Sequence, residues 1–363
     1  MEIKEYKCPN CGGSVKFDSS TQTMKCPYCD TEFEITALEE YQKEAAVPAR
    51  DSVGWKGDSA AGKSWESGEL EELSSGACPS CGAELLGDKN TIAMVCPSCG
   101  NAQIVERRLE GLLKPDYVIP FKLDKKTAVE ALKKFYKGKR LLPDFFREEN
   151  HINSIQGIYL PFWLFDAKAL GNVRYRATKV MTWSDNSYNY TKTDYYSAVR
   201  DGSVRFEKIP VDGSERMDDD YMDAIEPFDY GQMEDFRTAF LSGYSAEKYD
   251  VDADKSKERA GRRMKATLET EFAKSVTGYS SVVTENSVVD VEGGKVSYSL
   301  FPVWILNTKY KKESYLFVMN GQSGLLAGRL PVDAGKSWKY RLLFTGIIGV
   351  FLTAAIQALR LFL

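Results

Sequence analysis

Apolar positions recur with two different periods along the chain, and these periods predict where helices and strands lie. After Asp124, apolar side chains return every three or four residues through KKTAVEALKKFY, which predicts a helix that Asp124 caps. The aromatic stretches IQGIYLPFWLFDAKALGNVRYRATKVMTW and SYNYTKTDYYSAVR predict strands instead, and a helical pattern returns over about 232–275. Gly293-Gly294 and Asn320-Gly321 are typical of hairpin turns. Helices beside antiparallel, β-rich hairpins predict an α+β middle domain over 115–333.

Two of the strand-like stretches in this domain resemble each other. PFWLFDAK (Pro161–Lys168) aligns with PVWILNTK (Pro302–Lys309), and both place a tryptophan two residues after the proline and end at a lysine. This repeat predicts a domain built from two related halves. Chance similarity between two aromatic strands is the alternative.

The last part of the chain is apolar on every side of a helix. Residues 342–359 read LLFTGIIGVFLTAAIQAL. As a helix, 342–363 would extend about 33 Å, close to the ~30 Å hydrocarbon core of a bilayer. Lys336, Lys339 and Arg341 precede it and only Arg360 follows, so we expect a single-pass helix in the cell membrane with the N-terminal bulk in the cytoplasm. A buried C-terminal core helix is the alternative.

Composition sets broad limits on function. The chain has 363 residues, 43% of them hydrophobic and 28% charged, which is enough for two or three domains. A formal net charge of -4 gives no overall field that would attract nucleic acid. His151 is the single histidine and lies in the polar stretch REENHINS, so we expect a surface or capping role for it.

The eight cysteines form four C-x-x-C pairs, which group into two quartets of the same spacing. Zn²⁺ prefers tetrahedral sites, and each C-x-x-C turn supplies two thiolates to such a site. The spacing therefore predicts two zinc ribbons, over 1–36 and 77–106, in a reducing cytosol where thiolates hold metal. The predicted ligands are Cys8, Cys11, Cys26 and Cys29 in the first ribbon and Cys78, Cys81, Cys96 and Cys99 in the second.

Coordination by cysteine alone limits what these sites do. A zinc ion with four protein ligands has no open position, so we expect structural sites and no enzyme activity. Iron, in an Fe–S or rubredoxin-type centre, is the alternative because ligand type alone does not fix the metal. CPYC at 26–29 also matches the active-site sequence of glutaredoxins, but no βαβ pattern surrounds it, so redox catalysis is not expected.

Residues 37–76 are rich in Ala, Ser, Gly and Glu and predict a flexible linker between the ribbons. Within them, GDSAAGKS (57–64) satisfies the P-loop pattern. No apolar strand precedes this string and no amphipathic helix follows it, so nucleotide binding is not expected. Trp55 and Trp65 are unusual in a linker, and the sequence does not predict what they contact.

Charge argues against nucleic acid as a partner. Neither ribbon has an excess of basic residues, which a phosphate-binding module needs. The basic run 255–265 predicts a solvated helix face, or a contact with anionic lipid if it lies near a bilayer. The acidic tract 217–236 lacks EF-hand spacing and predicts a solvated loop.

The order of these features resembles a bacterial family. Paired CPxC ribbons, a tryptophan-bearing linker, PFW-type strands, the strings FVMNGQSG and LPVDAGK and a C-terminal membrane helix are similar to membrane-anchored double zinc-ribbon proteins of Gram-positive bacteria, of the YdjG type, whose ribbons are often labelled TFIIB-type. The resemblance covers nearly the whole chain. It implies association with membrane-stress machinery, namely phage-shock PspA-like and SPFH (band-7) proteins.

These patterns lead to one expected function and two alternatives. We expect a membrane-tethered cytoplasmic adaptor whose zinc ribbons recruit or anchor protein partners. A zinc-ribbon nucleic-acid-binding protein held at the membrane is one alternative, and a nucleotide hydrolase that uses 57–64 is the other.

Overall fold

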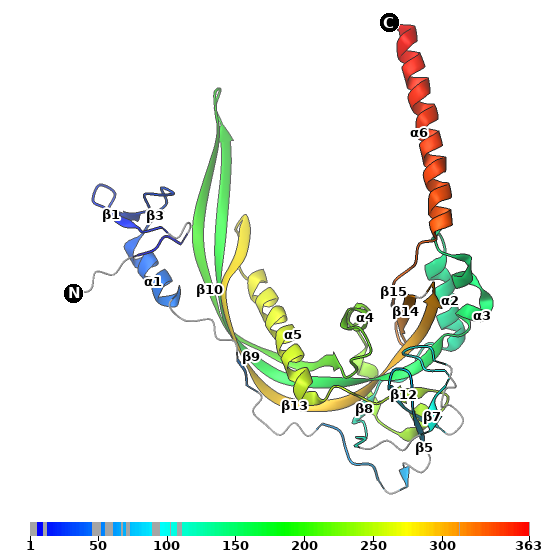
Figure 1. Cartoon of the computed structure of the whole chain (residues 1–363). Coiled ribbons are helices and arrows are strands. Elements are labelled where there is room, and N and C mark those ends of the chain that lie inside the picture. Colours follow the sequence, from blue (N-terminus) through cyan, green and yellow to red (C-terminus); the bar gives the residue numbers. More distant parts are fainter. Residues whose placement is uncertain are drawn as a thin grey trace. The chain divides into compact units, whose positions relative to one another are not determined.

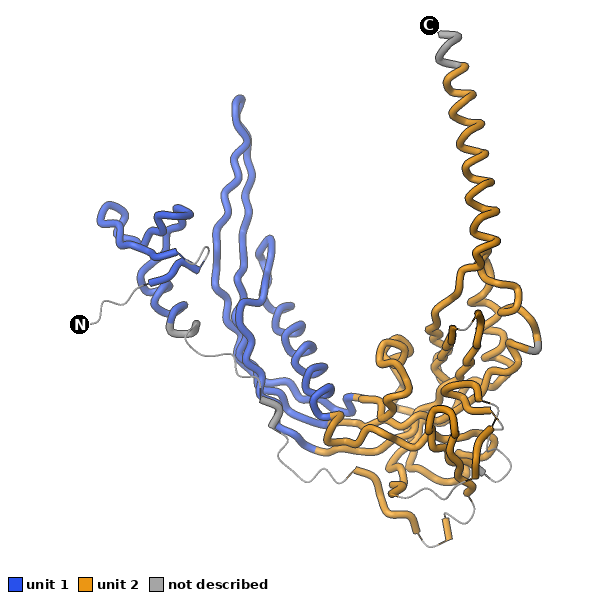
Figure 2. Tube along the Cα trace, in the orientation of Figure 1, with its two compact units in different colours: residues 1–57, 166–209, 257–294 blue, residues 58–165, 210–256, 295–363 orange. Residues whose placement is uncertain are grey.

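The computed structural model (Figure 1) divides into two compact units (Figure 2). Each unit is assembled from three segments of the chain, because three long strands contribute residues to both: β9 (Gln156–Ser184), β10 (Asn189–Asp212) and β13 (Ser281–Tyr310). The first unit comprises 1–57, 166–209 and 257–294, and the second comprises 58–165, 210–256 and 295–363. The structure describes residues 6–9, 13–45, 52–54, 61–66, 68–69, 73–88, 95–101, 103–106, 111–311 and 313–362.

The first unit begins with a small antiparallel sheet. Its strands are β1 (Lys16–Asp18), β2 (Thr23–Lys25) and β3 (Glu32–Phe33), in that order, and helix α1 (Ile35–Ala45) follows. The buried core of this module consists of Val15, Met24 and Leu38 together with two cysteines. A core of so few apolar side chains contributes little stability, and a metal bound by the cysteines would add to it.

The rest of the first unit is a long-stranded sheet covered by helix α5 (Ala253–Lys274). The helix lies close to β9 at Gly171, where an added Cβ would approach the Leu268 side chain to 2.5 Å. The Tyr175 hydroxyl donates to the Glu269 carbonyl at 2.9 Å and fixes the helix further along. Strand β4 (Ser52–Gly54) pairs in parallel with β13.

Helix α5 begins later than the predicted start near 232. Ser245–Glu247 forms strand β12 instead, and the Asp252 carboxylate accepts a hydrogen bond from the Lys255 backbone N–H at 2.8 Å. The pairing of β12 in the sheet therefore takes precedence over the helical pattern in this stretch.

The second unit is built on a mixed sheet with strand order β11-β8-β13-β9-β12-β6-β5-β7, and β14 and β15 extend it beside β13. Two pairs are parallel, β8 with β13 and β12 with β9. The α+β class predicted from the sequence is confirmed. The bounds of the further strands are β5 (Leu73–Ala77), β6 (Glu84–Asp88), β7 (Val105–Glu106), β8 (Tyr117–Val118), β11 (Glu234–Asp235), β14 (Glu313–Asn320) and β15 (Leu326–Gly328).

Alternation along β13 separates two cores on the two faces of this sheet. Phe301, Val303 and Ile305 belong to one apolar cluster, whereas Trp304 and Leu306 belong to the other. The first cluster packs with helix α4, and the second packs with α2, η2 and α3. The bounds of these helices are α2 (Lys125–Tyr136), η2 (Asp144–Arg147), α3 (Glu149–Ile152) and α4 (Asp219–Ala224), with short turns η3 (Tyr230–Gln232) and η4 (Thr238–Leu241) nearby.

The two resembling stretches lie on neighbouring strands, β9 and β13, in matching surroundings. The indole N–H of Trp163 donates to the Val251 carbonyl at 2.8 Å, and that of Trp304 donates to the Leu123 carbonyl at 3.2 Å. In both cases the acceptor is followed by an aspartate that accepts a hydrogen bond from a backbone N–H in the first turn of a helix, α2 or α5. The correspondence therefore extends beyond the two octapeptides.

The strand pairs around this repeat are exchanged between the halves. Strand β8 pairs with Ser299 and Leu300, just before one PxW stretch, and β12 pairs with Ile158 and Tyr159, just before the other. In chain order, one half runs β8, α2, β9 and the other runs β12, α5, β13. Strand β8 thus pairs with β13 of the other half, and β12 pairs with β9. This exchange accounts for the two parallel pairs β8–β13 and β12–β9.

Part of the predicted linker is docked in the second unit. Lys63 and Lys114 exchange backbone hydrogen bonds of 2.9 Å, and the Trp65 indole N–H donates to the Leu112 carbonyl at 3.0 Å. The described part of the P-loop-like string is 61–64, and the described residues directly after it, 65–66 and 68–69, contain no α-helix. Within 37–76 the chain also forms most of α1, all of β4 and the start of β5, so this stretch differs from the flexible linker that composition predicted. Trp55 lies outside the described residues.

The chain ends in the long helix α6 (Ala334–Phe362). Its segment Ala334–Gln357 is long and apolar enough to cross a membrane, and none of the apolar window is buried. The alternative of a buried core helix is therefore not supported. The base of α6 is fixed to the second unit, because the Lys336 ammonium donates to the Leu142 carbonyl and to Asp144.

Candidate metal centres

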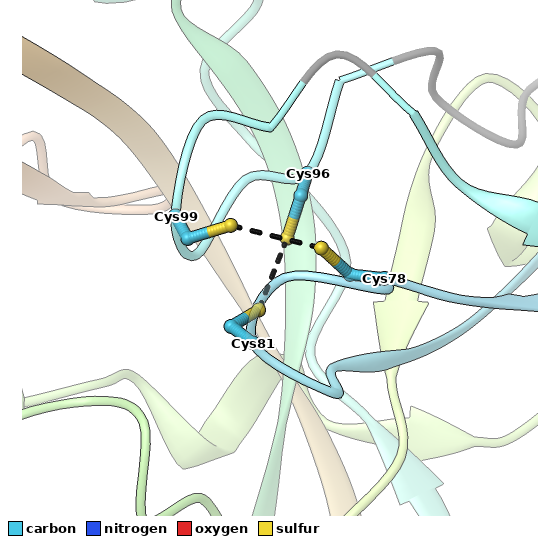
Figure 3. Close-up of side chains that lie close together, drawn as sticks. All are labelled: Cys78, Cys81, Cys96 and Cys99. Carbon is cyan, nitrogen blue, oxygen red and sulfur yellow. Dashed lines mark hydrogen bonds between the residues drawn. The ribbon is translucent and has the colours of Figure 1, made fainter.

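The second cysteine quartet converges on one point (Figure 3). Cys78, Cys81, Cys96 and Cys99 come from two turns, one between β5 and β6 and one before β7, and their sulfurs all lie within 4.8 Å of one another. The Sγ atoms of Cys78 and Cys99 are 3.7 Å apart, as are those of Cys81 and Cys96. The first cysteine of each turn is buried and the second is half-buried.

These distances fit a tetrahedral metal. Zinc–sulfur bonds of about 2.3 Å at tetrahedral angles place sulfurs about 3.8 Å apart, whereas a disulfide needs about 2.05 Å. Gly82 and Gly100 follow the two turns with φ of +73° and +70°, a conformation that favours glycine and turns the chain back beneath the sulfurs. The four thiols can hold a metal ion in a closed site.

The thiols of this quartet differ in acidity. Burial raises the pKa of Cys78, but hydrogen bonds from the backbone N–H groups of Cys81 and Ser80 outweigh it and lower the pKa to about 6. Burial raises the pKa of Cys81 to about 11 and also raises the pKa of Cys96. A bound cation would stabilise every thiolate and so lower the pKa of all four thiols. Metal binding at neutral pH therefore releases protons.

Arg216 binds the backbone of the first turn of this quartet. Its guanidinium donates to the carbonyls of Cys81 and Gly82, both at 3.1 Å. The same group forms an ion pair with Asp250 and lies 3.6 Å from the buried Glu247 carboxylate. Burial raises the pKa of Glu247 to about 7, although Arg216 opposes this rise.

Asn307 holds the second turn. Its side-chain amide donates to the Ser98 carbonyl at 2.6 Å, and its amide oxygen accepts from the Ser314 hydroxyl at 2.8 Å. Strand β6 also pairs with β12, and Lys248 donates from its backbone and from its side chain to Glu84. The quartet is therefore built into the sheet of the second unit through both of its turns.

The first quartet is described for three of its cysteines. The sulfurs of Cys8, Cys26 and Cys29 form a cluster able to hold a metal, with Cys8 and Cys29 3.6 Å apart. Cys11 lies outside the described residues. Cys26 and Cys29 occupy a tight turn between β2 and β3, and not the start of a helix, so the geometry that activates a redox CPYC motif is absent from this described stretch.

Other residues considered in the sequence have structural contacts. His151 lies 3.0 Å from the Thr308 hydroxyl and packs on Phe145, and burial lowers its pKa, so it is more enclosed than the expected surface role. In the acidic tract, Asp218 caps α4 by accepting from the Asp220 backbone N–H.

Sequence reasoning missed the residues that support the second quartet. Arg216 precedes the acidic tract, and nothing local indicates that it reaches Cys81, 135 positions away. Asn307 had a weak signal, because it is a polar residue within the apolar run VWILNTK and occupies the place of Asp166 in the other repeat. Contacts over such separations do not appear in local periodicity.

Together, these features define a class of protein. It is an α+β sheet protein that carries two cysteine clusters able to hold metal and ends in a helix long enough to cross a membrane. The uncharacterized protein YdjG of Bacillus subtilis (strain 168) is 33% identical to it over 349 residues, which cover 96% of this chain and 95% of YdjG. The chain belongs to the YdjG family. No protein-family model and no solved structure matches it.

Proposed function

We propose that this protein is a membrane-anchored, non-enzymatic adaptor that binds zinc at both cysteine quartets and recruits a protein partner at the cytoplasmic face. The observation that carries the proposal is the closed quartet of the second unit, whose two turns are held by Arg216 and Asn307. A metal with four protein ligands has no position left for substrate, so the site supports a fold and not a reaction. Helix α6 supplies the anchor, and the cations before it favour a cytoplasmic bulk.

The two ribbons differ in what they offer a partner. The second is integrated into the sheet through β6 and β12. The first leaves large side chains exposed, with Tyr28 75% and Phe17 51% accessible. Tyr28 is also held in place, because its ring packs on Gly13 so closely that a Cβ there would lie 2.4 Å from it. Exposed aromatic residues on a fixed support are typical anchors of protein interfaces.

Charge on the first ribbon supports a protein partner over a nucleic acid. Lys25 is near two carboxylates, at 3.4 Å from Glu32 and 4.0 Å from Asp30, so this surface carries mixed charge. A phosphate backbone would require an excess of unpaired cations. The family resemblance implies PspA-like or SPFH-type membrane-stress components as partners, and these are the first proteins to test.

The test is capture of partners by the full chain from cross-linked cell membranes. We expect Phe17→Ser with Tyr28→Ser to lose a protein that the wild type retains. The matched control, Trp183→Ser with Tyr188→Ser, removes two exposed aromatic residues from the β9–β10 hairpin and is expected to retain that protein. Metal content is measured in all three proteins, so that loss of a ribbon is not mistaken for loss of an interface.

Two results would contradict the proposal. The same captured proteins in both double variants would show that the first ribbon is not the recruiting surface. A salt-dependent mobility shift of DNA or RNA by the full chain would favour the nucleic-acid alternative instead.

A further inference from the structure

A basic cavity lies at the C-terminal end of α2, beside the start of α6. It has a volume of about 1100 Å³ and is lined by five cationic side chains and one carboxylate, Glu149. The cationic side chains are Lys133, Lys134, Lys137, Arg140 and Arg147. The lining therefore carries a large excess of positive charge.

Most of this charge is not neutralised by the protein. Glu149 pairs with Lys133 at 3.2 Å. Among the residues that the structure describes, Lys134, Lys137 and Arg140 form no ion pair with a carboxylate. Lys133, Lys134 and the C-cap Lys137 complement the C-terminus of α2, but Arg140 lies beyond the cap, so the helix dipole does not account for the whole cluster.

The position of the cavity along α6 indicates the source of that ligand. Tyr340, on α6, also lines the cavity and lies two residues before the apolar stretch that begins at Leu342. Two residues correspond to about 3 Å along a helix axis. If α6 crosses a bilayer, the cavity is therefore at the level of the lipid headgroups, which form a layer several ångströms thick outside the hydrocarbon.

We propose that this cavity binds the headgroup of an anionic phospholipid in the leaflet that α6 enters. Lys134, Lys137 and Arg140 pair with the phosphate oxygens of the headgroup. This inference rests on the membrane anchoring of the proposed function. It adds a lipid ligand that anchoring alone does not require.

The experiment measures lipid adducts of the purified full chain by native mass spectrometry, in detergent with equal amounts of phosphatidylglycerol and phosphatidylcholine. We expect the wild type to prefer phosphatidylglycerol at least tenfold. Lys134→Ala with Lys137→Ala and Arg140→Ala should abolish this preference, since each cation near an anionic lipid contributes a factor of about five. The matched control, Lys122→Ala with Lys125→Ala and Lys126→Ala, removes the same charge near the other end of α2 and should retain it.

Three results would overturn the inference. These are equal binding of the two lipids by the wild type, equal losses in the two triple variants, or displacement of phosphatidylglycerol by millimolar inorganic phosphate, which would show a free-phosphate site. Release of the chain from cell membranes by alkaline carbonate would instead contradict the anchoring itself. The failure of the lipid site and the failure of the proposed function are thus distinguishable.

Discussion

Arg216→Ala removes the link between the first turn of the second quartet and the buried Glu247 carboxylate. The guanidinium donates two hydrogen bonds to the carbonyls of Cys81 and Gly82 and pairs with Asp250. Because these contacts join the candidate metal site to the sheet, their loss should affect the stability of the protein and the retention of metal together.

The magnitude follows from the burial of the partners. Removing one member of a buried ion pair costs about 3–5 kcal/mol, and hydrogen bonds from a charged donor contribute about 1.5–3 kcal/mol each. The side chains of Arg216 and Asp250 are each 24% exposed, so solvent screening reduces both contributions. We expect the free energy of unfolding to fall by about 3 kcal/mol at pH 8, and metal release from this quartet to accelerate about 10- to 100-fold.

The pH dependence of this effect is set by Glu247. Its folded pKa, about 7, lies above the ordinary value of 4.5, so the folded state holds the proton more tightly than the unfolded state does. The contribution of Glu247 to stability is therefore fully present below pH 4.5 and is lost as the pH rises through 7, by at most about 3 kcal/mol. Without Arg216 this pKa rises further, so Arg216→Ala should cost more at pH 8 than at pH 5.

The assay is denaturant unfolding of the full chain in detergent at pH 5 and pH 8, with transfer of metal to a chromogenic chelator. Arg237→Ala is the control, because its ion pair with Glu234 is exposed and should contribute less than about 1 kcal/mol. Adding Glu247→Gln to Arg216→Ala should recover part of the loss at pH 8. An Arg216→Ala protein as stable as the control at both pH values would refute the reasoning.

Further predictions concern the metal, the helix packing and the repeat. Cys78→Ser should lower the metal content by one ion per chain, measured by elemental analysis, and an unchanged content would exclude a site there. Gly171→Ala should destabilise the fold by about 1–3 kcal/mol, because the new Cβ overlaps Leu268; Gly346→Ala, which meets nothing within 4 Å, is the control in thermal unfolding. Trp304→Phe should cost at least about 1 kcal/mol by losing its indole hydrogen bond, and a denaturant midpoint equal to that of the wild type would contradict this.

Local patterns in the sequence predicted the features that depend on residues close together in the chain. The Asp124 cap and the apolar period after it predicted a helix, and the structure has one over Lys125–Tyr136. C-x-x-C spacing likewise indicated four thiols per site, because two residues between cysteines suit one tight turn. The long apolar stretch at 342–359 was visible for the same reason, although only the structure, which leaves its apolar window unburied, argued against a core helix.

Contacts between distant segments could not be predicted in this way. Strand β8 has two residues and β12 has three, too few for any period, and each is defined by pairing with a long strand far away in sequence. Trp65 was noticed as unusual, but its acceptor, the Leu112 carbonyl, is 47 positions away. The exchange between the two halves is a property of the pairing, and the octapeptide repeat gives no indication of it.

The measurement that tests the account most directly is the metal content of the purified full chain, determined by elemental analysis together with unfolding in the presence of a chelator. Two closed four-thiolate sites predict two zinc ions per chain, no iron, and a clear loss of stability when zinc is removed. Fewer than two metal ions, iron in place of zinc, or unfolding that is unaffected by the chelator would contradict the claim that structural zinc sites underlie the adaptor.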